Sequence, residues 1–314
     1  MSGQHGQMMP SGPPYIPKTA GYGGRPDKGV DVPISSVFIA IFFTLAVIHM
    51  ALFARNRRRG HFFVFSAVVF GFCMSRIVTF SMRIAWATHP RNAQVAIAAS
   101  VFVAAGVVLL FVVNLNFAQR LLRAYHPRLV GNKLFDRGFL VYYISVVLVL
   151  IIVITTTVQS FYTLSAHTLN IDSSIRKFGI IYFAVFAFAP IPMLLIGNLI
   201  PSNTPRQNFG KRGDLTEKTL IVLFASGILI FTLTETALST ALRAATSFMP
   251  RPATDPGWFN SRASFYVFTP LLEVVVVAMY AATRADQKFH VEGNFERKRA
   301  AESGENIVET SEKA

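Results

Sequence analysis

Seven long apolar stretches recur along this chain, and they constrain its fold more than any other feature. They cover residues 32–53, 62–86, 93–116, 138–161, 178–200, 219–242 and 264–283. Each has about the 20 residues that an α-helix needs to cross a hydrocarbon core of ~30 Å. Apolar residues occur on all faces of each predicted helix, whereas a soluble helix would keep a polar stripe. The pattern predicts an all-α polytopic membrane protein, with a seven-transmembrane helix bundle over residues 32–284.

The distribution of charge supports this prediction and gives the bundle a direction. Charged residues make up 15% of the 314 residues, against about 25% in a typical soluble domain. Of the 30 lysines and arginines, 19 fall in one alternating set of loops and 9 in the other. The richer set belongs in the cytoplasm. We therefore expect the N-terminus outside and the C-terminus in the cytoplasm, in the plasma membrane or an endomembrane.

The terminal segments are predicted to lie outside the bundle. Residues 1–31 are rich in Gly, Pro and Met and lack the apolar core of a signal peptide, so we expect a disordered extracellular or lumenal tail. Residues 285–314 are expected to form a charged cytoplasmic tail. The expected partners are membrane lipids, with anionic headgroups at the cytoplasmic face, and a cytosolic protein at the basic inner loops. No nucleic acid partner is expected, because the cations lie in short loops.

Four ionisable residues lie inside the predicted spans: Arg76, Arg83, Glu235 and Glu273. An unpaired charge at membrane depth costs at least ~2.5–3.5 kcal/mol, so such residues face the bundle and find partners. At ~1.5 Å per residue, Arg76 lies roughly 21 Å and Glu235 about 24 Å from the cytoplasmic side, and Glu273 about 13 Å below the outer face. These similar levels predict an Arg76–Glu235 or an Arg76–Glu273 pair. Arg83 is expected on the same helical face, near the outer interface.

Further polar residues are expected at this level, among them Gln159, Thr234 and Thr269. If the polar faces converge, the outer half of the bundle holds a cavity open to the exterior, which would be a ligand pocket or a transporter vestibule. Alternatively, the same residues form interhelical hydrogen bonds and buried ion pairs that fix the helix register. The seven named residues are therefore candidates for ligand binding or for buried ion pairing.

Prolines and small residues predict local features of the helices. Pro190 and Pro192 lie in the middle of the fifth span, and Pro270 lies one turn before Glu273, so kinks are expected there. Small residues cluster in the third span at Ala98, Ala99, Ala104, Ala105 and Gly106. Such a cluster predicts close approach by a neighbouring helix.

Several classes of membrane protein are excluded by missing residues. Residues 264–283 contain no lysine, which a retinal Schiff base needs, and no two histidines have the i, i+4 spacing of a helical zinc site. The single cysteine, Cys73, lies in an apolar stretch, where we expect a packing role. No glycine-rich phosphate-binding loop is present. We expect no catalytic residue, metal or cofactor, and no enzymatic activity.

The seventh span and its exit carry a recognisable motif. Residues 265–273 read Phe-Tyr-Val-Phe-Thr-Pro-Leu-Leu-Glu, and residues 284–290 read Arg-Ala-Asp-Gln-Lys-Phe-His. This motif resembles a family of uncharacterised fungal seven-helix membrane proteins and, more distantly, the fungal lipid-translocating, drug-resistance exporters. The exporters carry an acidic residue just before the aromatic pair, where this chain has Arg262, Ala263 and Ser264. The resemblance implies a fungal origin and the seven-span layout, while this departure weighs against lipid translocation.

Three functions remain open from the sequence. The first is a receptor-like or sensor protein with a ligand pocket around Arg76, Glu235 and Glu273. The basic inner loops favour this function, because they offer an interface for a cytosolic partner. The second is a lipid or amphiphile transporter, in which Arg76 and Arg83 attract an anionic headgroup. The chain lacks the repeats and broken glycine-rich helices of many secondary transporters, which disfavours that function. The third is a non-catalytic membrane scaffold whose buried charges only hold helices together.

Overall fold

A computed structural model describes residues 12–15, 23–127, 133–201, 205–245 and 261–291, with the backbone alone at 104 and 234–245. Within these ranges the regular structure is helical and contains no strand. Seven of the helical segments are long and apolar enough to cross a membrane. The predicted all-α, seven-span fold of an integral membrane protein is confirmed, whereas the orientation of its termini stays a prediction.

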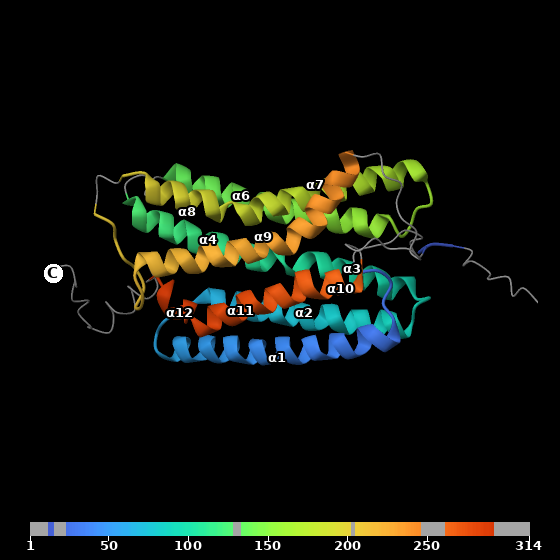
Figure 1. Ribbon diagram of the computed structural model, residues 1–314, viewed down its shortest axis with the longest axis horizontal. Coiled ribbons are helices and arrows are strands. Elements are labelled where there is room, and N and C mark those ends of the chain that lie inside the picture. Colours follow the sequence, from blue (N-terminus) through green and yellow to red (C-terminus); the bar gives the residue numbers. More distant parts are fainter. Residues whose placement is uncertain (1–11, 16–22, 128–132, 202–204, 246–260, 292–314) are drawn as a thin grey trace, which may run out of the picture.

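The described residues form twelve helical elements, eleven in the seven spans and one after the seventh, and some of them are joined end to end (Figure 1). They are α1 (Lys28–Arg58), α2 (Val64–Thr88), α3 (Ala93–Gly106), α4 (Val108–Tyr125), α6 (Lys133–Gln159), α7 (Ala166–Phe188), α8 (Pro190–Leu199), α9 (Leu215–Ala245), α10 (Arg262–Tyr266), the π-helix η2 (Val267–Leu271), α11 (Leu272–Ala282) and the short α12 (Ala285–Lys288). The third span is α3–α4, the fifth is α7–α8, and the seventh is α10–η2–α11.

The ends of the bundle differ from the predicted boundaries. Helix α1 begins at Lys28 because Asp27 caps it, accepting a hydrogen bond from the amide of Gly29 at 3.0 Å. Residues 28–31 therefore belong to the first span and not to the predicted tail. At the other boundary, α12 packs against α11, and Phe289 is completely buried. The first residues of the predicted tail at 285–314 thus pack against the bundle as far as His290.

The helices lie along the long axis of the molecule, in two groups with a pair of helices between them (Figure 1). Helix α1 packs against α2 and α11, while α7 packs against α6 and α8. Helices α4 and α9 pack against each other and also contact members of both groups. The core is therefore formed around α4 and α9.

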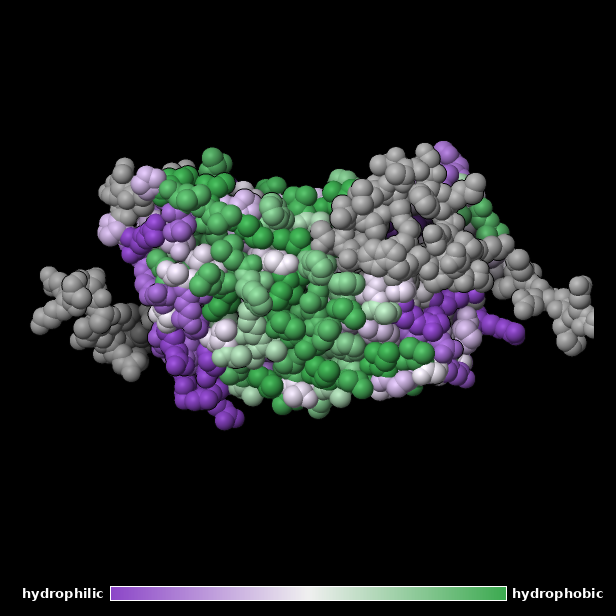
Figure 2. All heavy atoms as spheres, in the orientation of Figure 1, coloured by the Kyte–Doolittle hydropathy of each residue, from purple (hydrophilic) through white to green (hydrophobic). Residues whose placement is uncertain are grey.

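The molecular surface has the pattern of a membrane protein. Figure 2 shows a hydrophobic band across the middle of the visible face, with hydrophilic residues toward both ends. Helix α6 exposes a row of apolar residues, Leu140, Val141, Ile144, Val147, Leu148, Ile151 and Ile152. We call the end that carries Arg55, Arg57, Arg58, Arg59, Lys211 and Lys288 the basic end, and the end that carries Asp27, Gln159 and Ser261 the distal end.

Three of the spans are interrupted, and two of the interruptions fall at proline. Helices α7 and α8 join at Ala189, next to Pro190, whose ring nitrogen cannot donate a helical hydrogen bond. Pro270 lies inside the π-helix of the seventh span. The third span is interrupted at Val107, which no proline explains. Interruptions of this kind leave backbone carbonyls that need another hydrogen-bond donor.

Candidate functional site

Arg76 of α2 and Glu273 of α11 form an ion pair inside the bundle. Arg76 Nε donates to Glu273 Oε2 at 2.7 Å, and Arg76 Nη2 donates to the other carboxylate oxygen. The two residues are 1% and 0% exposed. A bidentate arginine–carboxylate contact is among the strongest side-chain interactions. It ties the second span to the seventh, just after the π-helix.

The third nitrogen of the Arg76 guanidinium donates hydrogen bonds to the backbone of the interrupted third span. Nη1 donates to the carbonyl oxygens of Val103, at 3.2 Å, and Phe102, at 3.5 Å. Both carbonyls lie in the last turn of α3, just before the break at Val107. A Cβ atom added at Gly106 would lie 3.0 Å from Arg76 Cζ. The close approach predicted for this run of small residues is thus made by helix α2, with the Arg76 side chain against Gly106.

A second buried ion pair joins Arg83 of α2 to Asp31 of α1. Arg83 Nε and Nη2 each lie 2.7 Å from Asp31 Oδ1. The Tyr266 hydroxyl donates to the same oxygen at 2.8 Å and lies 2.9 Å from the hydroxyl of Ser35. Arg83 is 3% exposed and Asp31 0%. The pair connects the first two spans to α10 at the start of the seventh.

These contacts continue toward the distal end. Asp31 Oδ2 accepts a hydrogen bond from the amide of Asp27 at 2.8 Å and lies 3.4 Å from Arg262 Nε. Arg83 Nη2 also donates to the carbonyl of Gly23 at 2.7 Å. The Arg262 side chain is 41% exposed, so the contacts reach the molecular surface. We call Ser35, Asp31, Arg83, Arg262 and Tyr266 the distal network.

Aromatic rings pack around the buried Arg83 and Tyr266 side chains of the distal network. The Phe38 ring stacks on Tyr266 at 5.8 Å and on Phe80 at 5.3 Å between centroids. Phe265 lies beneath the Arg83 guanidinium, with its centroid 4.3 Å from Cζ. A low local dielectric strengthens hydrogen bonds and ion pairs, and it raises the cost of an unpaired charge. The two arginines of α2 are therefore held firmly only while their carboxylates are present.

Polar contacts also hold the half of the seventh span beyond the ion pair. The Tyr280 hydroxyl donates to Asn114 Oδ1 at 3.0 Å, and Asn114 Nδ2 donates to the Ser226 hydroxyl at 2.7 Å. His49 Nε2 lies 3.1 Å from the carbonyl oxygen of Val277. Helix α11 is thereby bonded directly to α1 and α4, and through Asn114 to α9.

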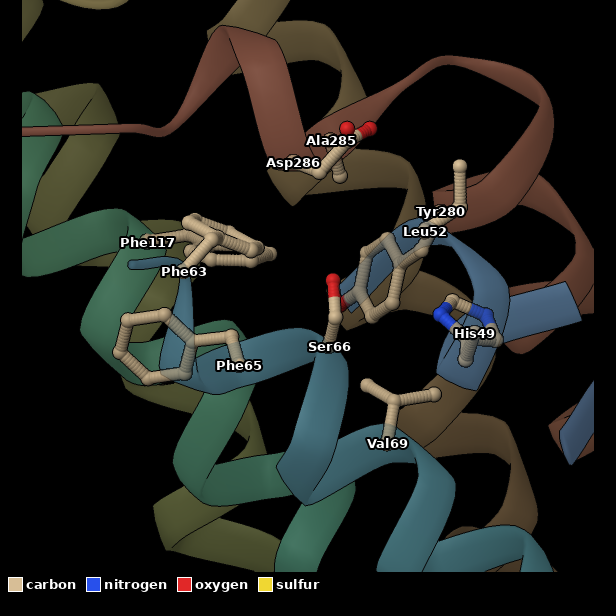
Figure 3. Close-up of a pocket in the computed structure, with 10 residues that line it drawn as sticks. All are labelled: His49, Leu52, Phe63, Phe65, Ser66, Val69, Phe117, Tyr280, Ala285 and Asp286. Atoms are coloured by element: carbon tan, nitrogen blue, oxygen red, sulfur yellow. The ribbon is translucent and has the colours of Figure 1, made fainter. Parts of the chain in front are cut away.

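A small cavity lies beside these contacts. Figure 3 shows its lining residues, including His49, Ser66 and Tyr280 around a gap closed on one side by Phe63 and Phe117. Its volume is about 10 Å³, and a single water molecule needs ~10–15 Å³. The cavity is therefore too small to bind a ligand.

Asp286 fixes α12 to the end of α1. Asn56 Nδ2 donates to Asp286 Oδ2 at 2.7 Å, and Arg284 Nε donates to Oδ1 at 3.1 Å. Burial disfavours the charged carboxylate, but the hydrogen bonds from Arg284 and Asn56 outweigh it and hold the pKa of Asp286 below its usual value. Asp286 is therefore a carboxylate at neutral pH, and its charge is already shared with Arg284.

The structure brings together some of the predicted site residues and leaves others apart. Arg76 pairs with Glu273, and Arg83 belongs to the distal network. Thr269 lies in η2, and Gln159 is exposed at the end of α6, away from both pairs. The side chains of the remaining two, Thr234 and Glu235, lie outside the described residues.

Asp31 was not among the candidates predicted from the sequence, although it is the partner of Arg83. It lies within residues 1–31, which the sequence assigns to the tail. The signal that identifies it is local: Asp27 is a good N-cap residue, and Asp31 follows one turn later in the first turn of the helix. Tyr266 and Ser35 complete the surroundings of the Asp31 carboxylate. No sequence pattern identifies either residue.

Comparisons with known proteins match one part of the chain. Residues 200–290 match a family model described as "Protein of unknown function (DUF3112)". No curated protein and no solved structure matches the chain. The matched segment contains α9, Glu273 and α12, and therefore the seventh span whose motif carried the resemblance noted above. Over this segment the chain is similar to an uncharacterised family.

Proposed function

We propose that this integral membrane protein is a receptor-like sensor in which the seventh span is the moving element. The observation that carries the proposal is the position of the Arg76–Glu273 pair. Glu273 lies three residues after Pro270, directly beyond the π-helix that interrupts the span. A π-turn and a proline both weaken the local hydrogen bonding of a helix, and they frequently mark functional hinges.

We call the π-helix η2 and the adjoining Glu273 the joint of the seventh span. The polar contacts divide the span into two parts, one on either side of this joint. The distal network holds α10 through Tyr266. Asn114 and His49 hold α11, and α12 is held by Asn56 through Asp286. Between the two sets, the ion pair fixes the joint itself. A change in the distal network is expected to reach the basic end through this span, because packed elements shift between discrete arrangements.

The distal network is the proposed receiving end. Arg262 is half-exposed and lies 3.4 Å from buried Asp31, so it connects the surface to the network. A ligand that competes for Arg262 or Asp31 would favour one arrangement of α10 over another, and a ligand shifts a conformational equilibrium only by such a difference in affinity. With the N-terminus outside, the basic end meets the cytosolic partner. A glycosylation tag on the N-terminus would test that orientation.

Hydrogen–deuterium exchange tests the coupling between the two ends. Asp31→Asn weakens the distal network, and we expect faster exchange at residues 280–290 of the basic end, about tenfold for each 1.4 kcal/mol of local stability lost. Gln159→Ala is the matched control, because Gln159 is exposed at the same end and outside the network. Faster exchange that stays within the residues around Asp31 would contradict the sensor.

A membrane scaffold is the alternative that one observation favours. Arg76, Arg83, Asp31 and Glu273 are all bonded within the bundle, as purely structural ion pairs would be. In a scaffold, the variant's effect on exchange would stay local. Lipid or amphiphile transport is tested separately by the flip of fluorescent lipids in proteoliposomes with and without the protein, where faster flip would favour the transporter.

A further inference from the structure

A polar cavity opens at the basic end, away from both buried ion pairs. Its volume is about 150 Å³, roughly ten times what one water molecule needs. The lining residues are Asn56, Arg59, His61, Lys211, Asp286, Gln287 and His290. None of them belongs to the distal network, and the cavity has no part in the proposed sensing of a ligand there.

Three segments far apart in the sequence build the cavity. At the end of α1, Gly60 has a φ of +79°, and the amide of His61 returns to donate to the Asn56 carbonyl at 2.9 Å. In the loop before α9, Gly210 has a φ of +77°, and a Cβ atom there would lie 2.2 Å from the Lys288 carbonyl oxygen. Only glycine allows the loop to approach α12 so closely.

The close approach at Gly210 positions Lys211. The Lys211 amide donates to the Gln287 carbonyl at 2.9 Å, which anchors this residue against α12. The Lys211 ammonium contacts the imidazole of His61, and the His61 and His290 rings lie 5.2 Å apart between centroids. The cavity therefore has a backbone-anchored wall and does not depend on flexible surface side chains alone.

The charges that line the cavity favour an anion. Arg59 and Lys211 supply a guanidinium and an ammonium, and both residues are exposed. Asp286 is the single acidic lining residue, and its charge is shared with Arg284 and Asn56. Within the described part of the chain, no group of three or more His, Cys, Asp or Glu residues could hold a metal ion. A cation site is therefore not supported here.

We propose that this cavity binds a terminal phosphate group, either the phosphate monoester of a lipid headgroup or free inorganic phosphate. A guanidinium and an ammonium, with two imidazoles and two side-chain amides, supply the donors that phosphate oxygens require. A phosphate placed between Arg59 and Lys211 would also accept hydrogen bonds from either histidine. The group comes from a lipid headgroup or from free phosphate, because the cavity lies at the basic end of the bundle, where the first and seventh spans end.

Binding to full-length protein in nanodiscs tests this site and its source of phosphate. In one arm, the nanodiscs contain phosphatidylcholine alone, and inorganic phosphate is titrated with ³¹P NMR as the readout. In the other arm, they also contain phosphatidic acid, whose headgroup is a phosphate monoester, and native mass spectrometry counts the retained lipid. We expect binding in at least one arm. The double variant Arg59→Gln/Lys211→Gln is expected to bind about tenfold more weakly or worse.

The matched control is Arg57→Gln/Arg58→Gln, which removes the same amount of charge from the same end of the bundle. Both of these arginines are exposed and neither lines the cavity. Binding that is lost in the first variant and kept in the control supports a built site. Equal weakening in both variants would show attraction by diffuse surface charge and would overturn the proposal, as would the absence of binding in both arms.

Discussion

Replacing Arg76 with alanine is expected to destabilise the protein by about 3–5 kcal/mol, the range found when one partner of a buried ion pair is removed. The variant leaves the Glu273 carboxylate buried without its cation, and it removes the donor to the Val103 carbonyl at the break in the third span. Thermal unfolding in detergent, followed by fluorescence-detected size exclusion, measures the loss.

A second substitution identifies the cause of that loss. Adding Glu273→Gln to Arg76→Ala removes the unpaired charge, so the double variant is expected to be more stable than the single one. Glu235→Gln in the same background is the control, because Glu273 is the carboxylate that accepts from Arg76. A rescue by Glu235→Gln, or no rescue by Glu273→Gln, would contradict the ion-pair assignment.

Asp31→Ala is expected to have an effect of similar size, about 3–5 kcal/mol, although Asp31 lies at the very start of the first span. The substitution leaves the Arg83 guanidinium buried among aromatic rings, and it removes the acceptor for the Tyr266 hydroxyl. The same thermal measurement applies.

The control for Asp31 is Asp136→Ala, which breaks the ion pair between Asp136 and Arg123. The side chains of that pair are 58% and 47% exposed, and exposed pairs contribute about 0–1 kcal/mol. Equal losses of stability in the two variants would mean that the distal network contributes no more than a surface contact.

The seven spans and the level of the buried charges could be predicted from the sequence for simple physical reasons. A lipid-facing helix needs a long apolar stretch, so its presence is visible without any knowledge of the fold. A fixed rise per residue converts position into depth, which placed Arg76 level with Glu273. Depth does not say which helices touch, and so the contact between Arg76 and Glu273 needed the structure.

Other features depend on contacts between distant segments, which no local pattern records. The break at Val107 lies in an apolar run without proline, and the carbonyls it leaves are bonded by an arginine from another helix. The cavity at the basic end requires the loop at Gly210 to meet α12. Such features follow from tertiary packing, and neither hydrophobic periodicity nor helix propensity predicts them.

In the proposed sensor, the Arg76–Glu273 pair holds the joint of the seventh span in one arrangement. Electron–electron double resonance would measure the distance between spin labels at Ala282→Cys, at the end of α11, and Leu134→Cys, at the start of α6. That distance reports the arrangement of the seventh span. Both positions are exposed, and the native Cys73 is buried and protected from labelling. We predict a single distance in the otherwise wild-type protein and a second population in Glu273→Gln. An unchanged distance distribution in that variant would contradict the claim.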